Sequence, residues 1–148
     1  MIRHLLTIAT FMLLNFTVVH AQVEKTFFQT FNVKDGVRRI FLQSYDIFEL
    51  KPWNGVQLMV ETTIRLEGGS MDLLGLLIKD ERYNFSYEEN PEGISFHSKL
   101  SSRPNVKRLG QVCTEKLKVY IYVPEEFNIV NNTELVRKEL IVAKGGKF

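Results

Sequence analysis

The sequence predicts a mainly β protein, either an antiparallel sandwich or a flattened, solenoid-like β-roll, with one short helix. Apolar and polar residues alternate at period two through most of the chain after residue 26, which is typical of strands with one buried face. Turn-forming residues separate these stretches, as at Asp35-Gly36 and Asn90-Pro91. The composition, 45% apolar and 24% charged over 148 residues, is that of a folded globular chain, so we expect one domain.

The first 21 residues predict a secretory signal peptide. A short basic start is followed by an apolar run over residues 5–19, and Val19-His20-Ala21 provides the small residues of a cleavage site. A retained membrane anchor is the alternative, but spanning needs about 20 apolar residues and this run is shorter. We therefore expect export to the periplasm, the cell surface or the medium, with no membrane span left after cleavage.

The clearest predicted strand covers residues 56–67, where every second side chain from Val56 to Leu66 is apolar or threonine. Residues 116–123 repeat the pattern. Shorter alternating stretches bring the expected number of strands to about eight. These stretches are residues 27–34, 37–43, 47–50, 83–87 and 94–100.

Residues 70–80 predict the single helix. Ser70 can cap it, Asp72 lies in its first turn, and the apolar residues that follow are spaced for a helix. These are Leu73, Leu74, Leu76, Leu77 and Ile78. Because they surround most of the cylinder, we expect the helix to be buried against an open end or face of the sheet. The alternative is an exposed leucine-rich docking patch.

These elements predict a single β-rich domain over residues 22–130. We expect residues 131–148 to form a C-terminal extension with one last strand at 139–143 and a frayed end.

The sequence predicts no enzyme, cofactor or metal site. It contains no recognisable pairing of a nucleophile or base with an orienting group. His97 has the parity of a solvent-facing side chain, and the single cysteine, Cys113, is expected to be buried. Tyr83, Phe85 and Tyr87 share one parity and are expected in the core. A net charge of +2 is too small to predict a nucleic-acid partner.

The candidate binding residues are cationic or aromatic. They are Arg103, Lys107, Arg108, Lys116, Lys118, Tyr120 and Tyr122. Residues 99–118 predict a long basic loop, which either pairs with the acidic stretch at 80–92 or meets an anionic partner such as an acidic glycan or a lipid head group. The last four candidates share one side of a strand. If exposed, they form a strip suited to stacking on a sugar or binding an anionic polymer, but we expect a second sheet or the helix to cover them.

Four short stretches carry a resemblance to a known family. They are Phe31-Asn32-Val33, Trp53-Asn54-Gly55-Val56-Gln57-Leu58-Met59-Val60-Glu61, Arg82-Tyr83-Asn84-Phe85 and Tyr122-Val123-Pro124-Glu125. Over roughly residues 26–130 the chain resembles the adhesin-like family of exported bacterial β proteins. The resemblance implies strands stacked in a roll or solenoid, and adhesion, but no catalytic residues.

Together these features predict a non-enzymatic, exported, envelope-associated β domain that binds an envelope protein or an anionic polysaccharide. The alternative is a carrier of a small apolar ligand or lipid, a β shell closed by the leucine-rich helix.

Overall fold

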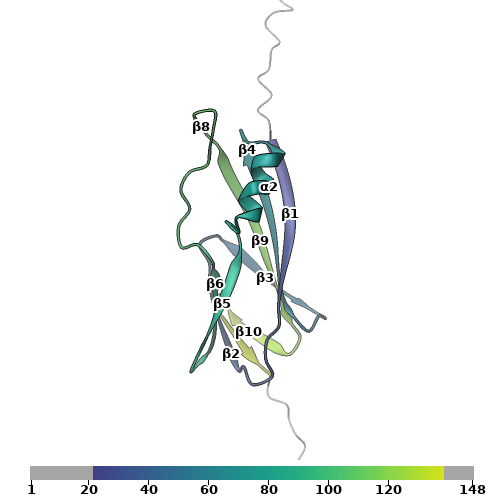
Figure 1. Cartoon of the computed structure of the whole chain (residues 1–148). Helices are drawn as coiled ribbons and strands as arrows, with labels where there is room; N and C mark the ends of the chain where they lie inside the picture. The colour runs from purple at the N-terminus through teal and green to yellow at the C-terminus, as the bar shows by residue number, and fades with distance from the viewer. Residues whose placement is uncertain (1–21, 139–148) are drawn as a thin grey trace, which may run out of the picture.

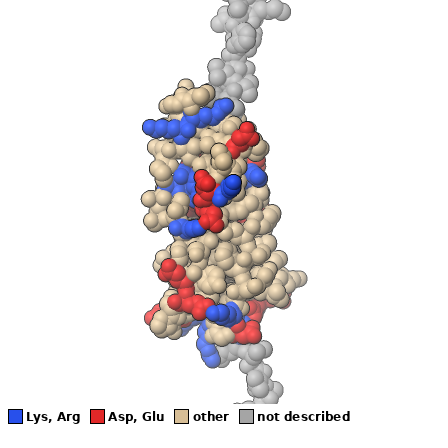
Figure 2. Space-filling model, in the orientation of Figure 1, with Lys and Arg blue, Asp and Glu red and all other residues tan. Residues whose placement is uncertain are grey.

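The computed structural model describes residues 22–138, which form two β-sheets, a small hairpin and a helix in an elongated molecule (Figure 1). Basic and acidic side chains are interspersed along its length (Figure 2). The predicted signal peptide and the strand expected at 139–143 lie outside these residues. The mainly β fold with one short helix is confirmed.

Sheet A has four strands in the order β1-β4-β9-β3. Their bounds are Gln22–Phe31 for β1, Phe48–Trp53 for β3, Leu58–Glu67 for β4 and Thr114–Pro124 for β9. The long central strand β4 pairs antiparallel with β1 on one side and β9 on the other, whereas β3 pairs with β9 in parallel.

Sheet B has five strands in the order β10-β11-β2-β6-β5. Their bounds are Arg39–Gln43 for β2, Phe85–Asn90 for β5, Gly93–Ser98 for β6, Phe127–Asn131 for β10 and Glu134–Arg137 for β11. Its β2 and β6 are parallel and its other pairs antiparallel. Each sheet is therefore mixed rather than purely antiparallel. In each parallel pair the two strands are far apart in the chain, which provides the long connection that parallel pairing requires.

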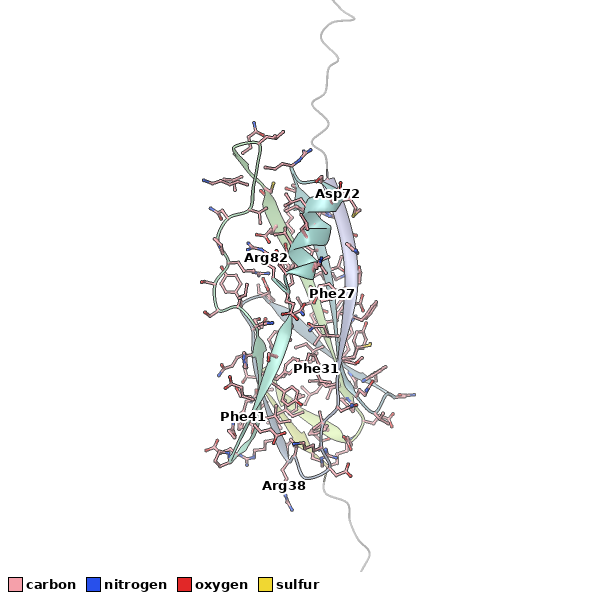
Figure 3. All side chains as sticks on the ribbon, viewed as in Figure 1. Phe27, Phe31, Arg38, Phe41, Asp72 and Arg82 are labelled. Carbon is pink, nitrogen blue, oxygen red and sulfur yellow. The ribbon has the colours of Figure 1, made fainter. Side chains whose placement is uncertain are left out.

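The main core lies between the two sheets. Val60 and Ile121 from sheet A pack in one cluster with Ile40 and Phe96 from sheet B, and all four are fully or nearly fully buried. Phe31 joins this cluster from β1, with its ring 4.9 Å from that of Phe96 (Figure 3). Alternation in β4 and β9 thus supplies the dry face of sheet A, as predicted.

The helix α2 (Met71–Lys79) covers the upper part of the same face of sheet A in the view of Figure 1. Ser70 caps it by accepting a hydrogen bond from the Leu73 amide at 3.3 Å, as predicted. Leu74 is fully buried with Ile64 and Leu66 of β4 in a second cluster. Within residues 22–138, no helix is long and apolar enough to cross a bilayer.

Two predicted boundaries need correction. The domain does not stop at residue 130, because β11 lies inside sheet B between β10 and β2, and its Leu135 is fully buried. The Asn131 side chain closes the β10–β11 turn by accepting a hydrogen bond from the Thr133 amide at 2.8 Å. The basic loop is also shorter than predicted: it contains the hairpin of β7 (Lys107–Arg108) and β8 (Gln111–Val112), and β9 begins at Thr114.

One of the three aromatic residues expected in the core is exposed. Tyr83 and Phe85 are buried, but Tyr87 is 40% exposed. It lies on β5, the edge strand of sheet B, where the sheet has no further neighbour to cover it.

Candidate functional site

The strongest candidate site is the outer face of sheet A. Lys116, Lys118, Tyr120 and Tyr122 point outward from β9, since they alternate with buried residues of the main core. The expectation that a second sheet or the helix covers them is wrong, because both the main core and the α2 cluster use the opposite face of sheet A. The two lysines are exposed and the two tyrosines half-buried among their neighbours on the sheet.

Two lysines converge on Tyr120. The ammonium of Lys51, on the adjacent strand β3, lies 3.2 Å from the centroid of the Tyr120 ring, and that of Lys118 lies 4.9 Å from it. Neither lysine has an ion-pair partner among the described residues. Hydrogen bonding with the Tyr120 side chain raises the pKa of Lys118 above its usual value of 10.5, and the charges of Glu49 and Glu61 act in the same direction. Two carboxylates flank the same ring, because Glu49 of β3 and Glu61 of β4 are the cross-strand partners of Tyr120. Tyr120 is thus surrounded by two cations and two carboxylates.

Tyr122 continues the aromatic surface and is held in place by two neighbours. Its hydroxyl donates a hydrogen bond to Glu61 at 2.6 Å, and this bond raises the pKa of Tyr122. Its ring lies 6.1 Å from that of Trp53 and 6.4 Å from that of Tyr120, both edge to face. The three rings therefore form a row across β3 and β9 whose geometry is fixed by the sheet.

A solvent-open hollow of about 460 Å³ adjoins this row. It is lined by Glu24, Thr26, Glu61, Thr63, Arg65, Lys116, Leu117, Lys118 and Tyr120. Two of its three cations are already paired, Arg65 with Glu24 at 2.9 Å and Lys116 with Glu67 at 2.6 Å. Lys118 is the lining cation left to meet a ligand.

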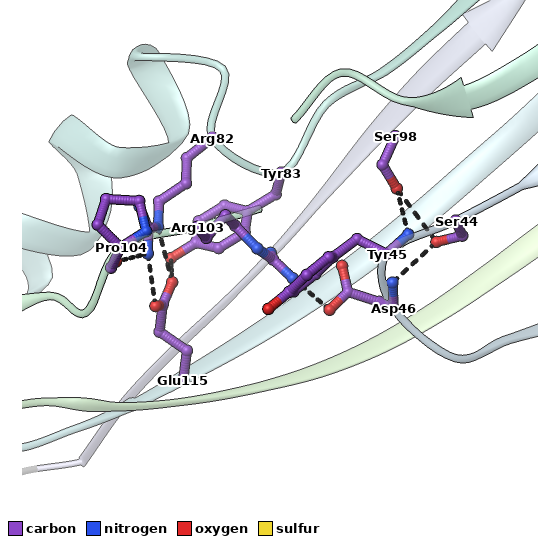
Figure 4. Close-up of polar contacts among 9 residues, drawn as sticks. All are labelled: Ser44, Tyr45, Asp46, Arg82, Tyr83, Ser98, Arg103, Pro104 and Glu115. Carbon is purple, nitrogen blue, oxygen red and sulfur yellow. Dashed lines mark hydrogen bonds and ion pairs between the residues drawn. The ribbon is translucent and has the colours of Figure 1, made fainter. Parts of the chain in front are cut away.

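Arg103 does not belong to a binding surface, contrary to prediction. Its side chain is only 7% exposed and is paired with Asp46 (Figure 4). Its guanidinium carbon lies 4.8 Å from the ring centroid of Tyr45 and 5.3 Å from that of Tyr83. Arg103 therefore fastens its loop to the residues between β2 and β3.

A second ion pair fastens the same loop. Arg82 donates two hydrogen bonds to the Glu115 carboxylate, at 2.9 and 2.7 Å, and one to the Pro104 carbonyl at 2.6 Å (Figure 4). Tyr83 donates a further one to Glu115 at 2.6 Å, and burial together with this bond raises the pKa of Tyr83. The acidic and basic stretches also meet through an ion pair between Lys99 and Glu81. Arg82, Lys99 and Arg103 are therefore engaged in ion pairs within the fold.

The other predicted residues lie elsewhere. Lys107 and Arg108 are exposed on the β7–β8 hairpin, apart from the outer face of sheet A. Cys113 is buried in the α2 cluster, as predicted, and His97 is half-buried on β6. Among residues 22–138, no three His, Cys, Asp or Glu side chains are grouped closely enough to hold a metal ion.

Three residues of this face were not among the predicted binding residues: Lys51, Trp53 and Glu61. Lys51 is the most important of them. Its outward direction follows from the alternation in β3, where Phe48 and Leu50 face the core. Its position beside Tyr120 depends on the parallel pairing of β3 with β9, for which the sequence has no local signal.

Comparisons of this chain with protein-family models, with curated proteins and with solved structures found no match.

Proposed function

We propose that the chain is a non-enzymatic, exported domain of the cell envelope that binds an anionic polysaccharide on the outer face of sheet A. The observation that carries this proposal is the convergence of Lys51 and Lys118 on Tyr120, on an uncovered face beside an open hollow.

The chemistry of the face suits an acidic sugar. Lys51 and Lys118 can meet a carboxylate or sulfate, while the rings of Tyr122 and Trp53 offer apolar surface to the C–H groups of a sugar ring. The Glu61 carboxylate can accept hydrogen bonds from sugar hydroxyls. Because Arg65 and Lys116 are already paired with carboxylates, Lys51 and Lys118 are the cations of this face that can meet an anionic group, and Glu49 and Glu61 beside them favour a ligand that also offers hydroxyl donors.

The carrier alternative has less support. Leu74 of α2 packs tightly into its cluster on β4, and no residue of α2 lines the 460 Å³ hollow or the 550 Å³ hollow between the Tyr45–Ile47 loop and β9. A carrier closed by this helix needs an internal cavity beneath the leucines.

Binding is tested with polygalacturonate, in which every sugar carries a carboxylate, and with neutral dextran, by isothermal titration calorimetry. Both hydrophobic clusters lie within residues 22–138, so a chain from Gln22 to Phe148 contains both of them and is used for the test. We expect binding to polygalacturonate alone, weakened about fivefold by Lys118→Gln and about tenfold by Tyr120→Ala.

Lys107→Gln removes an exposed cation outside the face and is the matched control, for which we expect unchanged binding. Equal affinity for dextran, or a Lys118→Gln variant that binds like the parent, would refute the proposal. The export step is tested separately by sequencing the N-terminus of the protein recovered outside the cytoplasm, which we expect to begin at Gln22.

A further inference from the structure

The tip of the β7–β8 hairpin carries a leucine that the fold does not bury. Leu109 is 92% exposed, and with Gly110 it forms the two-residue loop between the paired residues Arg108 and Gln111. Both loop residues have positive φ, +49° for Leu109 and +80° for Gly110, as in a type I′ turn. Asn-Gly is the preferred sequence there, because a bulky side chain is disfavoured at positive φ. Leu109 is therefore unfavourable both in its exposure and in its backbone conformation.

Cations flank this leucine. Lys107 and Arg108 are exposed, and neither has an ion-pair partner within residues 22–138. Other cations of the same basic stretch are paired, including Arg103 with Asp46 and Lys116 with Glu67. The hairpin thus combines unpaired positive charge with an exposed aliphatic side chain.

The hairpin lies at the upper end of the molecule in Figure 1, the end at which β1 begins and α2 starts. Figure 2 shows Lys and Arg side chains across this end. Met71, the first residue of α2, adds a half-exposed apolar side chain. Asp72 lies at the same end (Figure 3), beside the N-terminus of α2, whose partial positive charge offsets its carboxylate.

We propose that this hairpin tip docks on an anionic phospholipid bilayer, with Leu109 inserted among the acyl chains and Lys107 and Arg108 at the lipid phosphates. A bilayer suits the tip better than a glycan, because Leu109 gains free energy only by leaving water for an apolar medium. One leucine and two cations give weak, reversible and salt-sensitive binding. The outer face of sheet A, which contains none of these residues, remains free to hold a polymer.

The test is co-sedimentation of the chain from Gln22 to Phe148 with vesicles of phosphatidylcholine and phosphatidylglycerol at 70:30, and with pure phosphatidylcholine vesicles. We expect binding to the anionic vesicles only, reduced by high salt. Leu109→Asn should lower the partition coefficient about tenfold, since it removes the apolar side chain. Its melting temperature should equal or exceed that of the parent, because Asn suits the turn. Replacing both Lys107 and Arg108 with Gln should lower the partition about 25-fold.

Val56→Asn is the matched control. Val56 is 84% exposed and lies just before the start of β4. The hairpin lies near the other end of β4, where Glu67 pairs with Thr114, so Val56 is an exposed apolar residue away from the hairpin. We expect this variant to bind vesicles like the parent. Equal binding to neutral vesicles, no binding at all, or a Leu109→Asn variant that binds normally would overturn the proposal. Lys118→Gln distinguishes the two surfaces, because it should weaken binding to polygalacturonate but not to vesicles. A matching loss of vesicle binding would place the lipid contact on sheet A and refute the proposal for the hairpin tip.

Discussion

Arg103 and Lys118 lie in the same basic stretch of the sequence, yet the fold uses them differently. Arg103 is buried between two tyrosine rings and paired with Asp46, whereas Lys118 is exposed beside Tyr120 without an ion-pair partner in the described part of the chain. A buried cation is retained only where a carboxylate and aromatic faces replace its water. The same residue class therefore serves stability in one place and is available for binding in the other.

Thr62 is a single residue whose replacement should stabilise the protein. It is 1% exposed on the inner face of β4, and its hydroxyl has no hydrogen-bond partner among the described residues. Thr62→Val keeps the shape and removes an unsatisfied buried polar group, so we expect the free energy of unfolding to rise by about 1 kcal/mol in urea denaturation. The control is Thr63→Val on the outer face, where the hydroxyl is bonded to that of Thr26 at 2.7 Å and no gain is expected. A loss of stability in Thr62→Val would contradict this account.

At the scale of elements, β9 shows how one strand supplies both core and site. Val119, Ile121 and Val123 fill the space between the sheets, while Tyr120 and Tyr122 stand on the other face. Because this strand is held on both sides, by β4 and by β3, the outward rings are fixed in position. A rigid strand positions binding groups more accurately than a loop.

The helix α2 contains a correctable weakness at Gly75. A Cβ added there meets nothing within 4 Å, so Gly75→Ala should gain helix propensity without a clash. We expect a gain of about 1 kcal/mol in unfolding free energy, measured by chemical denaturation. Gly69→Ala provides the contrast, because its Cβ would lie 2.2 Å from Leu66 Cδ2 in the buried cluster, and it should destabilise. If Gly75→Ala and Gly69→Ala changed the free energy of unfolding equally, the open space at Gly75 and the close contact at Gly69 would both be contradicted.

At the scale of the whole molecule, one face of sheet A is covered by two different structures. Sheet B covers one part through the main core, and α2 with the loop after β6 covers the other. The Arg82–Glu115 and Arg103–Asp46 pairs fasten that loop, so they connect the two halves of the cover. The opposite face of sheet A is not covered by either structure within residues 22–138, and it is the face on which we propose binding.

This arrangement predicts a loss of stability in acid. Burial alone would raise the pKa of Glu115, but hydrogen bonds from Arg82 and Tyr83 outweigh it and hold this pKa below its usual value of 4.5. A carboxylate whose pKa is lowered in the folded state stabilises the fold at pH values above its unfolded-state pKa. This contribution disappears as the pH falls through its folded-state pKa. The free energy of unfolding should therefore decrease as the pH is lowered below about 4.5.

Glu115→Gln tests the origin of this dependence by urea denaturation at several pH values. It should cost about 2 kcal/mol at pH 7 and flatten the acid limb of the stability profile. Glu89→Gln, which removes the exposed partner of Lys34, should change neither. An acid limb that is as steep in Glu115→Gln as in the parent would assign the effect to other carboxylates.

The sequence by itself determined the mainly β class, the dry and wet faces of β4 and β9 and the cap of α2 at Ser70. These features depend on local geometry: alternation follows from the strand itself and capping from one turn of helix. The tertiary structure alone decided that Tyr120 and Tyr122 are uncovered, that Lys51 lies beside Tyr120 and that Arg103 is buried. Those outcomes depend on which distant strands pair and which face each layer covers, and this is decided by the packing of both sheets together rather than by any one stretch of chain.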